Sequence, residues 1–320
     1  MTAPAAASGD TDTEAAAPSP AARRKRIPKL PYALLVPAIA ILALGTGYPL
    51  LWQLLTSFRE YGLAQQFGKP AEWTGFDNYA ALLTDPVFWA IVGKSILFCL
   101  VTAAATMILG VGAALLMRYT PAWVRLSLQV SMLLAWAMPV VAQMTVWTWL
   151  VEDRNGVVNY LLTHLLGMDM IGHNWLVNPW SFFLVASVII TWASVPFVAF
   201  SVYAGFTTIS SEVVEAAHMD GASGFTMLRT IMLPIVKPVL SIVLLLQLIW
   251  DLRVFAQIKL LQDAGSFGQQ YDLLGTYIYK LGTGSQSFGM AAAAAIVTMA
   301  LTLALSWVYV RHLLKEDKQA

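Results

Sequence analysis

Side chains that could bind a small molecule stand inside a largely apolar stretch, LLLQLIWDLRVFAQIKLL. On a helix, Gln247 and Asp251 are one turn apart and share one face. A second face carries, at i, i+3 and i+7, the residues Trp250, Arg253 and Gln257. Sugar hydroxyl groups need hydrogen-bond partners and sugar rings stack on aromatic planes, so this combination predicts a sugar site inside the membrane.

A second interpretation of the same stretch stays open. Arg253 could extend its guanidinium to the water interface, as long cationic side chains do near helix ends. Asp251 would then pair with Lys94, which stands in another apolar run, or with a partner subunit.

Weaker candidates for the same pathway are Gln143, Trp147 and Trp192, in two other apolar runs. Gln143 and Trp147 are again one turn apart. A polar side chain that joins two helices by a hydrogen bond explains Gln143 equally well.

Catalysis and metal binding are not indicated. The chain has one cysteine, so neither a disulfide within the chain nor a thiolate cluster can form. The histidines have no H-E-x-x-H spacing, and the phosphate-binding pattern G-x-x-x-x-G-K-[ST] is missing. We therefore expect no catalytic residue, no metal and no cofactor of the chain's own.

The composition predicts the elements that position these residues. Of 320 residues, 58% are hydrophobic and only 12% are charged, against about one quarter in globular domains. The net charge of +1 gives no reason to expect nucleic acid. About 20 apolar residues cross a membrane. We therefore predict an all-α polytopic membrane protein with six spans, at about 32–58, 88–117, 124–151, 181–206, 238–258 and 290–311.

The chain ends are expected in the cytoplasm. Residues 1–31 are rich in Ala, Pro, Ser and Thr, which predicts a disordered tail, and they end in the basic cluster RRKRIPK. Lys and Arg concentrate in that cluster, in the loops on the same side and in the short tail 312–320, which places both termini inside. Trp73, Trp89, Trp175 and Trp180 are expected in an aromatic belt at the water interface.

The loop 207–237 is the other segment with a clear pattern, SEVVEAAHMDGASG followed by two prolines. Ser210 or Ser211 can cap a short helix with acidic first turns, and Gly221 can end it. Pro234 and Pro238 are expected to break any helix before the fifth span. We interpret the loop as a rigid helix that docks on a protein partner. A helix lying on lipid is the alternative, but its polar face would then be basic.

This loop resembles the EAA signature of permease subunits in binding-protein-dependent ABC importers, in the carbohydrate branch related to the maltose system. The sequence matches this signature in order and spacing: E-A-A, then three residues, G, nine residues and I-x-L-P. The segments YPLLWQLLTSF, WTGFDNYAALLTDPVFW and YIYKLGTGSQSFGMAAAAA are also similar to that family. The resemblance implies that a helix docks on an ATPase subunit through Glu212, Glu215, Ala216, Ala217, Asp220, Gly221, Ile231, Leu233 and Pro234.

The same resemblance implies a function and a set of partners. The chain would form part of the sugar translocation pathway of an ATP-driven importer in the cell membrane. The overall similarity of the sequence favours the disaccharide trehalose as the substrate. A second permease, two ATPase subunits that bind ATP and Mg²⁺, and an external sugar-binding protein or lipoprotein would complete it. Lys94 and Ser95 stand where the family has Asn-Thr, which weakens the transfer of substrate identity. A secondary transporter or channel for a small polar solute remains the alternative, although only Asp251 is an acidic residue well inside a span.

Overall fold

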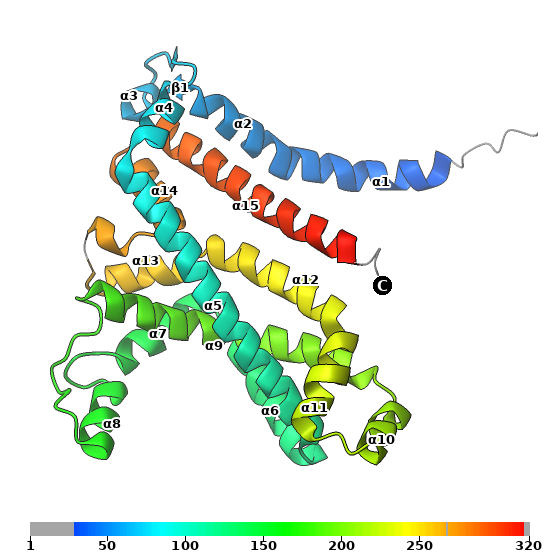
Figure 1. Cartoon of the computed structure of the whole chain (residues 1–320). Coiled ribbons are helices and arrows are strands. Elements are labelled where there is room, and N and C mark those ends of the chain that lie inside the picture. Colours follow the sequence, from blue (N-terminus) through cyan, green and yellow to red (C-terminus); the bar gives the residue numbers. More distant parts are fainter. Residues whose placement is uncertain (1–28, 267, 317–320) are drawn as a thin grey trace, which may run out of the picture. The chain divides into compact units, whose positions relative to one another are not determined.

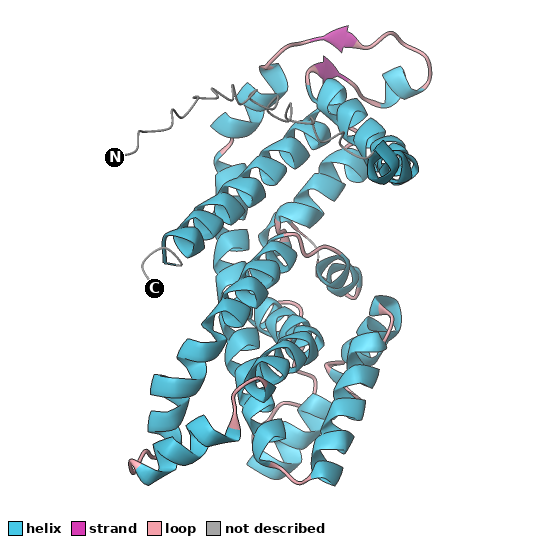
Figure 2. Cartoon of the chain, turned by 90° about the vertical axis from the view of Figure 1, so that its right-hand side faces the viewer, coloured by secondary structure: helices cyan, strands magenta, loops and turns pink. Residues whose placement is uncertain are grey.

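The computed structural model describes residues 29–266 and 268–316, and the chain divides into two compact units, residues 1–50 and 51–320. Helices make up most of the described residues, and the strands found among them form one short hairpin (Figures 1 and 2). Most of the predicted N-terminal tail, residues 1–28, and the end of the predicted C-terminal tail, residues 317–320, lie outside the described residues.

The first apolar run is one interrupted helix. α1 (Lys29–Leu42) passes through a π-helical turn at Ala43–Gly47 into α2 (Tyr48–Ser57). The helix therefore starts three residues before the predicted span, in what the sequence assigned to the tail. Pro49 lies in the first turn of α2 and does not end the helix.

A small polar layer follows α2. It consists of β1 (Arg59–Glu60), α3 (Leu63–Gln66), β2 (Glu72–Trp73) and α4 (Asp77–Thr84), with the two strands antiparallel. The hairpin pairs the residues Arg59 and Trp73, and the rings of Phe58 and Trp73 stack with their centroids 5.7 Å apart.

Two long helices, α5 (Pro86–Tyr119) and α9 (Pro179–Thr207), form the centre of the second unit. The same local chemistry starts both. Asp85 and Asn178 each accept a hydrogen bond at 2.9 Å from the backbone N–H two residues on, and a proline fills the next position. Such a cap satisfies an N–H group that the helix leaves unpaired, and proline has none to lose.

The two long helices run parallel, and α5 begins before α9 does. The rings of Phe98 and Phe183 lie 5.7 Å apart near the beginning of α9, and Gly110 packs against Val198 further along. At their ends the Arg118 guanidinium donates to the carbonyl oxygen of Phe206. Parallel packing of this kind fixes both helix starts on one side of the membrane and both ends on the other.

The remaining elements surround this pair in the second unit. They are α6 (Ala122–Ala137), α7 (Val140–Leu150), α8 (Val157–Leu166), α10 (Ser211–Met219), α11 (Gly224–Met227), α12 (Leu233–Leu252), α13 (Ala256–Asp263), α14 (Leu274–Tyr279) and α15 (Phe288–Glu316), with a 3₁₀ turn at Gln269–Tyr271 and π-helical turns at Leu228–Met232 and Lys280–Gly284.

Five helical runs of the described chain are long and apolar enough to cross a membrane, or six if the bent pair α6 and α7 is one span. The chain is thus an all-α polytopic membrane protein, as predicted. The third predicted span, 124–151, is not one helix, because α6 and α7 meet at 102°. The fifth predicted span, 238–258, begins earlier, in α12 at Leu233, and α12 ends at Leu252.

One further expectation was wrong in detail. Pro234 and Pro238 do not break the chain before the fifth span, since Pro234 lies in the first turn of α12 and Pro238 inside it. Pro234 has no N–H to give to the preceding turn, and the backbone passes through that turn as a π-helix, Leu228–Met232, and continues directly into α12. The predicted C-terminal tail is helical through Glu316, because α15 continues past the apolar run.

Candidate functional site

A break between α6 and α7 forms one side of a cavity inside the membrane domain. Met138 has extended backbone angles, φ −67° and ψ 127°, and the next residue is Pro139. The proline ring disfavours the helical conformation for the residue before it, so α6 ends there. The carbonyl oxygen of Pro139 then accepts from the backbone N–H of Gln143 at 2.9 Å, which starts α7 in a new direction.

A second break lies opposite, between α12 and α13. The backbone of Arg253 leaves the helical region, at φ −102° and ψ 10°, and Phe255 has φ −134° and ψ −60°. α13 resumes at Ala256. Non-helical backbone at membrane depth is tolerated only where it is buried in protein or lines a cavity, and paired breaks of this kind are where transporters bind their substrates.

Between the two breaks lies a cavity of about 460 Å³, bounded by α6, α7, α9, α12 and α13. Its polar side chains are Gln143, Ser194, Asp251, Arg253 and Gln257, and its aromatic ones are Trp136, Phe197, Trp250 and Phe255. The rings of Phe197 and Trp250 lie 5.0 Å apart at 59°. The cavity therefore offers flat apolar surfaces beside hydrogen-bonding groups.

The strongest polar feature of the cavity is the pair of Gln247 and Asp251. The Gln247 amide donates to the Asp251 carboxylate at 2.8 Å, and the two side chains are 0% and 3% exposed. Within the described residues, Asp251 Oδ2 and Gln247 Oε1 have no hydrogen-bond partner. Both oxygens are themselves buried, so they accept a hydrogen bond from a bound molecule only after the side chains turn toward the cavity.

The predicted pairing of Asp251 with Lys94 was wrong. Lys94 Nζ donates to the backbone carbonyl oxygens of Gln270, at 2.7 Å, and Gln269, at 3.4 Å. These carbonyls belong to the 3₁₀ turn Gln269–Tyr271, so Lys94 contacts that turn and not Asp251 of α12. Arg253 is exposed and at the same time lines the cavity. Its position therefore agrees in part with the predicted sugar site and in part with a guanidinium that reaches water.

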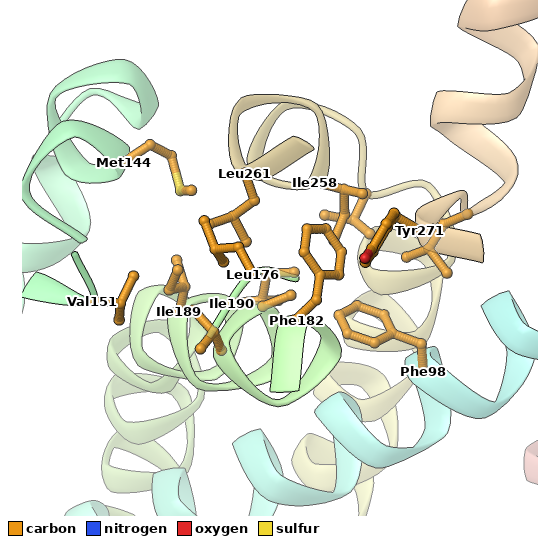
Figure 3. Close-up of a cluster of buried hydrophobic side chains, with 14 residues drawn as sticks. Phe98, Met144, Val151, Leu176, Phe182, Ile189, Ile190, Ile258, Leu261 and Tyr271 are labelled. Atoms are coloured by element: carbon orange, nitrogen blue, oxygen red, sulfur yellow. The ribbon is translucent and has the colours of Figure 1, made fainter. Parts of the chain in front are cut away.

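A buried cluster holds the cavity walls in place. Figure 3 shows Met144 of α7, Ile189 and Ile190 of α9, and Ile258 and Leu261 of α13 converging on one another. Gln143 and Gln257, each next to a member of this cluster, are thereby fixed on the cavity side.

The structure brings most of the predicted pathway residues together, namely Gln143, Trp250, Asp251, Arg253 and Gln257, with Gln247 bonded to Asp251. Trp147 and Trp192 do not line the cavity. They pack on each other edge to face, with centroids 5.8 Å apart at 75°.

Sequence reasoning missed the aromatic lining residues Trp136, Phe197 and Phe255. The signal that could have found Trp136 is its position one turn before Pro139, the residue that ends the helix.

The second candidate site is the loop around α10, next to the ends of α5 and α9. Gly221 has φ +76°, which L side chains rarely adopt. The backbone N–H groups of Gly221 and Ala222 donate to the carbonyl oxygens of His218, at 3.0 Å, and Ala217, at 2.9 Å. This is a Schellman motif, so Gly221 ends α10 as predicted. Ser210 is the N-cap residue, but its side chain makes no capping hydrogen bond.

The two alanines of this loop face opposite ways. Ala217 is 6% exposed and belongs to a buried cluster with Val202, Phe206 and Met227. Ala216 is exposed. So are the predicted partner-facing residues Glu212, Glu215, Asp220, Gly221 and Pro234, whereas Ile231 and Leu233 are half-buried.

The sequence did not single out two apolar side chains that flank this surface, Met219 at 88% and Phe225 at 72% exposed. The loop thus presents an acidic, small-residue ridge with apolar edges.

Comparisons with known proteins agree with this geometry. Diacetylchitobiose uptake system permease protein DasB of Streptomyces coelicolor is 39% identical over 90% of this chain and 88% of its own length. Sulfoquinovosyl glycerol transport system permease protein SmoG of Agrobacterium fabrum is 32% identical over 89% and 90%. Trehalose/maltose transport system permease protein MalF of Thermococcus litoralis is 29% identical over 88% and 93%.

A solved structure of a bacterial alginate ABC transporter, in complex with an alginate pentasaccharide-bound periplasmic protein, contains a chain with the same fold. The TM-score is 0.74 at 22% identity, over 88% of this chain and 92% of the other. Residues 106–313 match the family described as binding-protein-dependent transport system inner membrane component. This chain therefore belongs to that family, and it is an ABC importer permease of the cell membrane.

Proposed function

We propose that this chain is the permease subunit of an ATP-driven importer that carries a disaccharide through the cavity between its two helix breaks. The observation that carries the proposal is the cavity itself. Its aromatic walls, formed by Trp136, Phe197 and Trp250, are suited to sugar rings, and the Asp251 carboxylate lines the same cavity as a hydrogen-bond acceptor. Among the relatives, DasB is named for diacetylchitobiose uptake and the Thermococcus protein for trehalose and maltose, all with two rings, whereas SmoG is named for sulfoquinovosyl glycerol, with one. Two of these three names therefore support a two-ring substrate.

Trehalose, which the sequence favours, is one member of this substrate class and diacetylchitobiose is another. Both present several hydroxyl donors along one edge and apolar ring faces on the other. An external binding protein makes the first selection, and the cavity needs only to accept what that protein delivers.

Energy is supplied by other subunits, because the family consists of permeases and ATP hydrolysis takes place on separate ATPase subunits. In the proposed assembly two such subunits, which hold ATP and Mg²⁺, dock on the α10 loop, and a second permease completes the path. ATP binding favours one of two conformations and so alternates access to the cavity, which requires a difference in affinity between the two states. Both chain termini would then lie in the cytoplasm. Family membership also decides against a secondary transporter or a channel.

The experiment is sugar-stimulated ATPase activity of the reconstituted importer, measured against a panel of disaccharides with the Asp251→Asn variant beside the natural chain. Asparagine keeps the size of the side chain but removes its charge. A hydrogen bond to a charged group contributes about 1.5–3 kcal/mol, so we expect the sugar concentration for half-stimulation to rise about 10- to 100-fold.

The matched control is Asp263→Asn, because Asp263 is an exposed carboxylate on α13 that pairs with Lys259 and does not line the cavity. We expect that variant to behave like the natural chain. Equal sugar stimulation of all three proteins, at equal amounts of assembled complex, would remove the cavity from the pathway.

A further inference from the structure

A second cavity lies along the central helix pair, nearer to the beginning of α9 than the proposed pathway. Its volume is about 640 Å³, and it is a groove between α5 and α9. The α5 wall carries Lys94, Leu97 and Val101, and the α9 wall carries Trp180 and Leu184. None of the cavity residues of the pathway takes part in it.

The polarity of this groove changes along its length. Because α5 and α9 run parallel, increasing residue number leads inward from the same membrane surface on both walls. Lys94 and Trp180 therefore lie at the shallow end, with Gln270 of the loop above, and Val101 lies about 10 Å deeper at 1.5 Å per residue. The shallow end is cationic and hydrogen-bonding, whereas the deeper wall of α5 is apolar.

The lysine at the shallow end carries a charge that no carboxylate neutralises in an ion pair within the described part of the chain. Its hydrogen bonds go to two neutral carbonyl oxygens, and its ammonium lies 5.6 Å from the centre of the Phe183 ring. The nearby buried carboxylate, Asp272, forms its ion pair with Lys280 at 2.7 Å instead. An anion that enters the groove therefore meets a cation whose charge is still available.

We propose that this groove binds an anionic phospholipid, with its phosphate at Lys94 and an acyl chain along Leu97, Val101 and Leu184. The positive charge of Lys94 favours an anionic head group, and the apolar inner part of the groove accommodates an acyl chain. Trp180, which is 83% exposed, sits at the level where indole rings meet lipid head groups. The site is separate from the sugar pathway, so its test stands whether or not the proposed function holds.

The test uses the assembled importer in bilayer discs that contain equal amounts of phosphatidylglycerol and phosphatidylcholine. One of the two lipids carries a photoreactive acyl chain in each experiment, and labelled peptides of α5 and α9 are counted. We expect phosphatidylglycerol to label them about fivefold more than phosphatidylcholine, the preference that one lysine near an anionic lipid provides. Lys94→Gln should abolish the preference and Lys94→Arg should keep it.

Two matched controls separate a site from general contact with lipid. Lys69→Gln removes the same charge from an exposed position in the polar layer and should leave the preference unchanged. Val101→Trp should block labelling by both lipids, while Leu100→Trp, at a position of the same 52% exposure outside the groove, should not.

Equal labelling by the two head groups in the natural chain would overturn the proposal. So would a preference that survives Lys94→Gln, or cross-links from the groove to a protein subunit in place of lipid.

Discussion

At position 110 the packing of the two central helices leaves no space for a side chain. A Cβ atom on Gly110 would lie 2.5 Å from Val198 Cγ1 and 2.6 Å from Val198 Cβ, whereas a Cβ on Gly112 would meet nothing within 4 Å. Glycine at 110 thus lets α5 approach α9 closely enough for their ends to meet. The sequence showed small residues here but could not show which of them faces the partner helix.

We predict that Gly110→Ala destabilises the chain by about 1–3 kcal/mol, because the added methyl group forces α5 and α9 apart. Gly112→Ala should be neutral, or stabilising by about 0.5–1 kcal/mol, because alanine is the better helix former. The measurement is unfolding of both variants in a denaturing detergent titration. The same midpoint for the two would contradict the close approach.

At the scale of elements, length and hydropathy predicted the long helices well. α5 and α9 begin and end within a few residues of their expected bounds, because membrane thickness sets the length of an apolar run. The breaks could not be predicted in the same way. Pro139 ends a helix and Pro196 lies inside a continuous one, yet both are single prolines in apolar surroundings. Packing against neighbouring helices, which the sequence does not reveal, decides between the two outcomes.

The candidate site shows the same limit. The helical spacing of Gln247 and Asp251 was enough to predict that they share a face, because both lie on the unbroken part of α12. Trp147 was placed with Gln143 by the same rule, but α9 supplies Trp192 as a partner for it outside the cavity. Local spacing thus predicts a face, while neighbouring helices determine what that face contacts.

The break between α6 and α7 should depend on Pro139. We predict that Pro139→Ala allows Met138 to become helical, so that the two helices straighten and the cavity wall moves away from α12. Spin labels at the exposed positions Leu126 and Val146 report this, because 20 residues of straight helix span about 30 Å and a bend of 102° shortens that distance.

The Pro139→Ala variant should also lose sugar-stimulated ATPase activity, since Gln143 leaves the cavity with α7. Pro196→Ala serves as the control, because α9 is already continuous at that position. An unchanged label distance together with unchanged stimulation in Pro139→Ala would show that packing alone holds the break.

At the scale of the whole molecule, the proposed function requires that the two sites communicate. α12 connects them directly: it follows the α10 loop through the π-helical turn Leu228–Met232 and ends at the cavity with Asp251. The cluster that buries Ala217 also contains Met232 and Val236 of this run, so the loop and α12 are packed against each other. A force on α10 therefore reaches the cavity without a flexible joint between them.

Neighbouring alanines on α10 separate docking from folding, because Ala216 is exposed and Ala217 is 6% exposed. We predict that Ala216→Trp leaves the thermal stability of the isolated chain unchanged but prevents copurification of the ATPase subunits, since the new ring covers the docking ridge. Ala217→Trp should instead lower the stability of the chain itself by about 1–3 kcal/mol, because the cluster around Phe206 has no room for an indole. Full ATPase assembly with Ala216→Trp would mean that the partner binds elsewhere, and the connection from loop to cavity would then lose its role in transport.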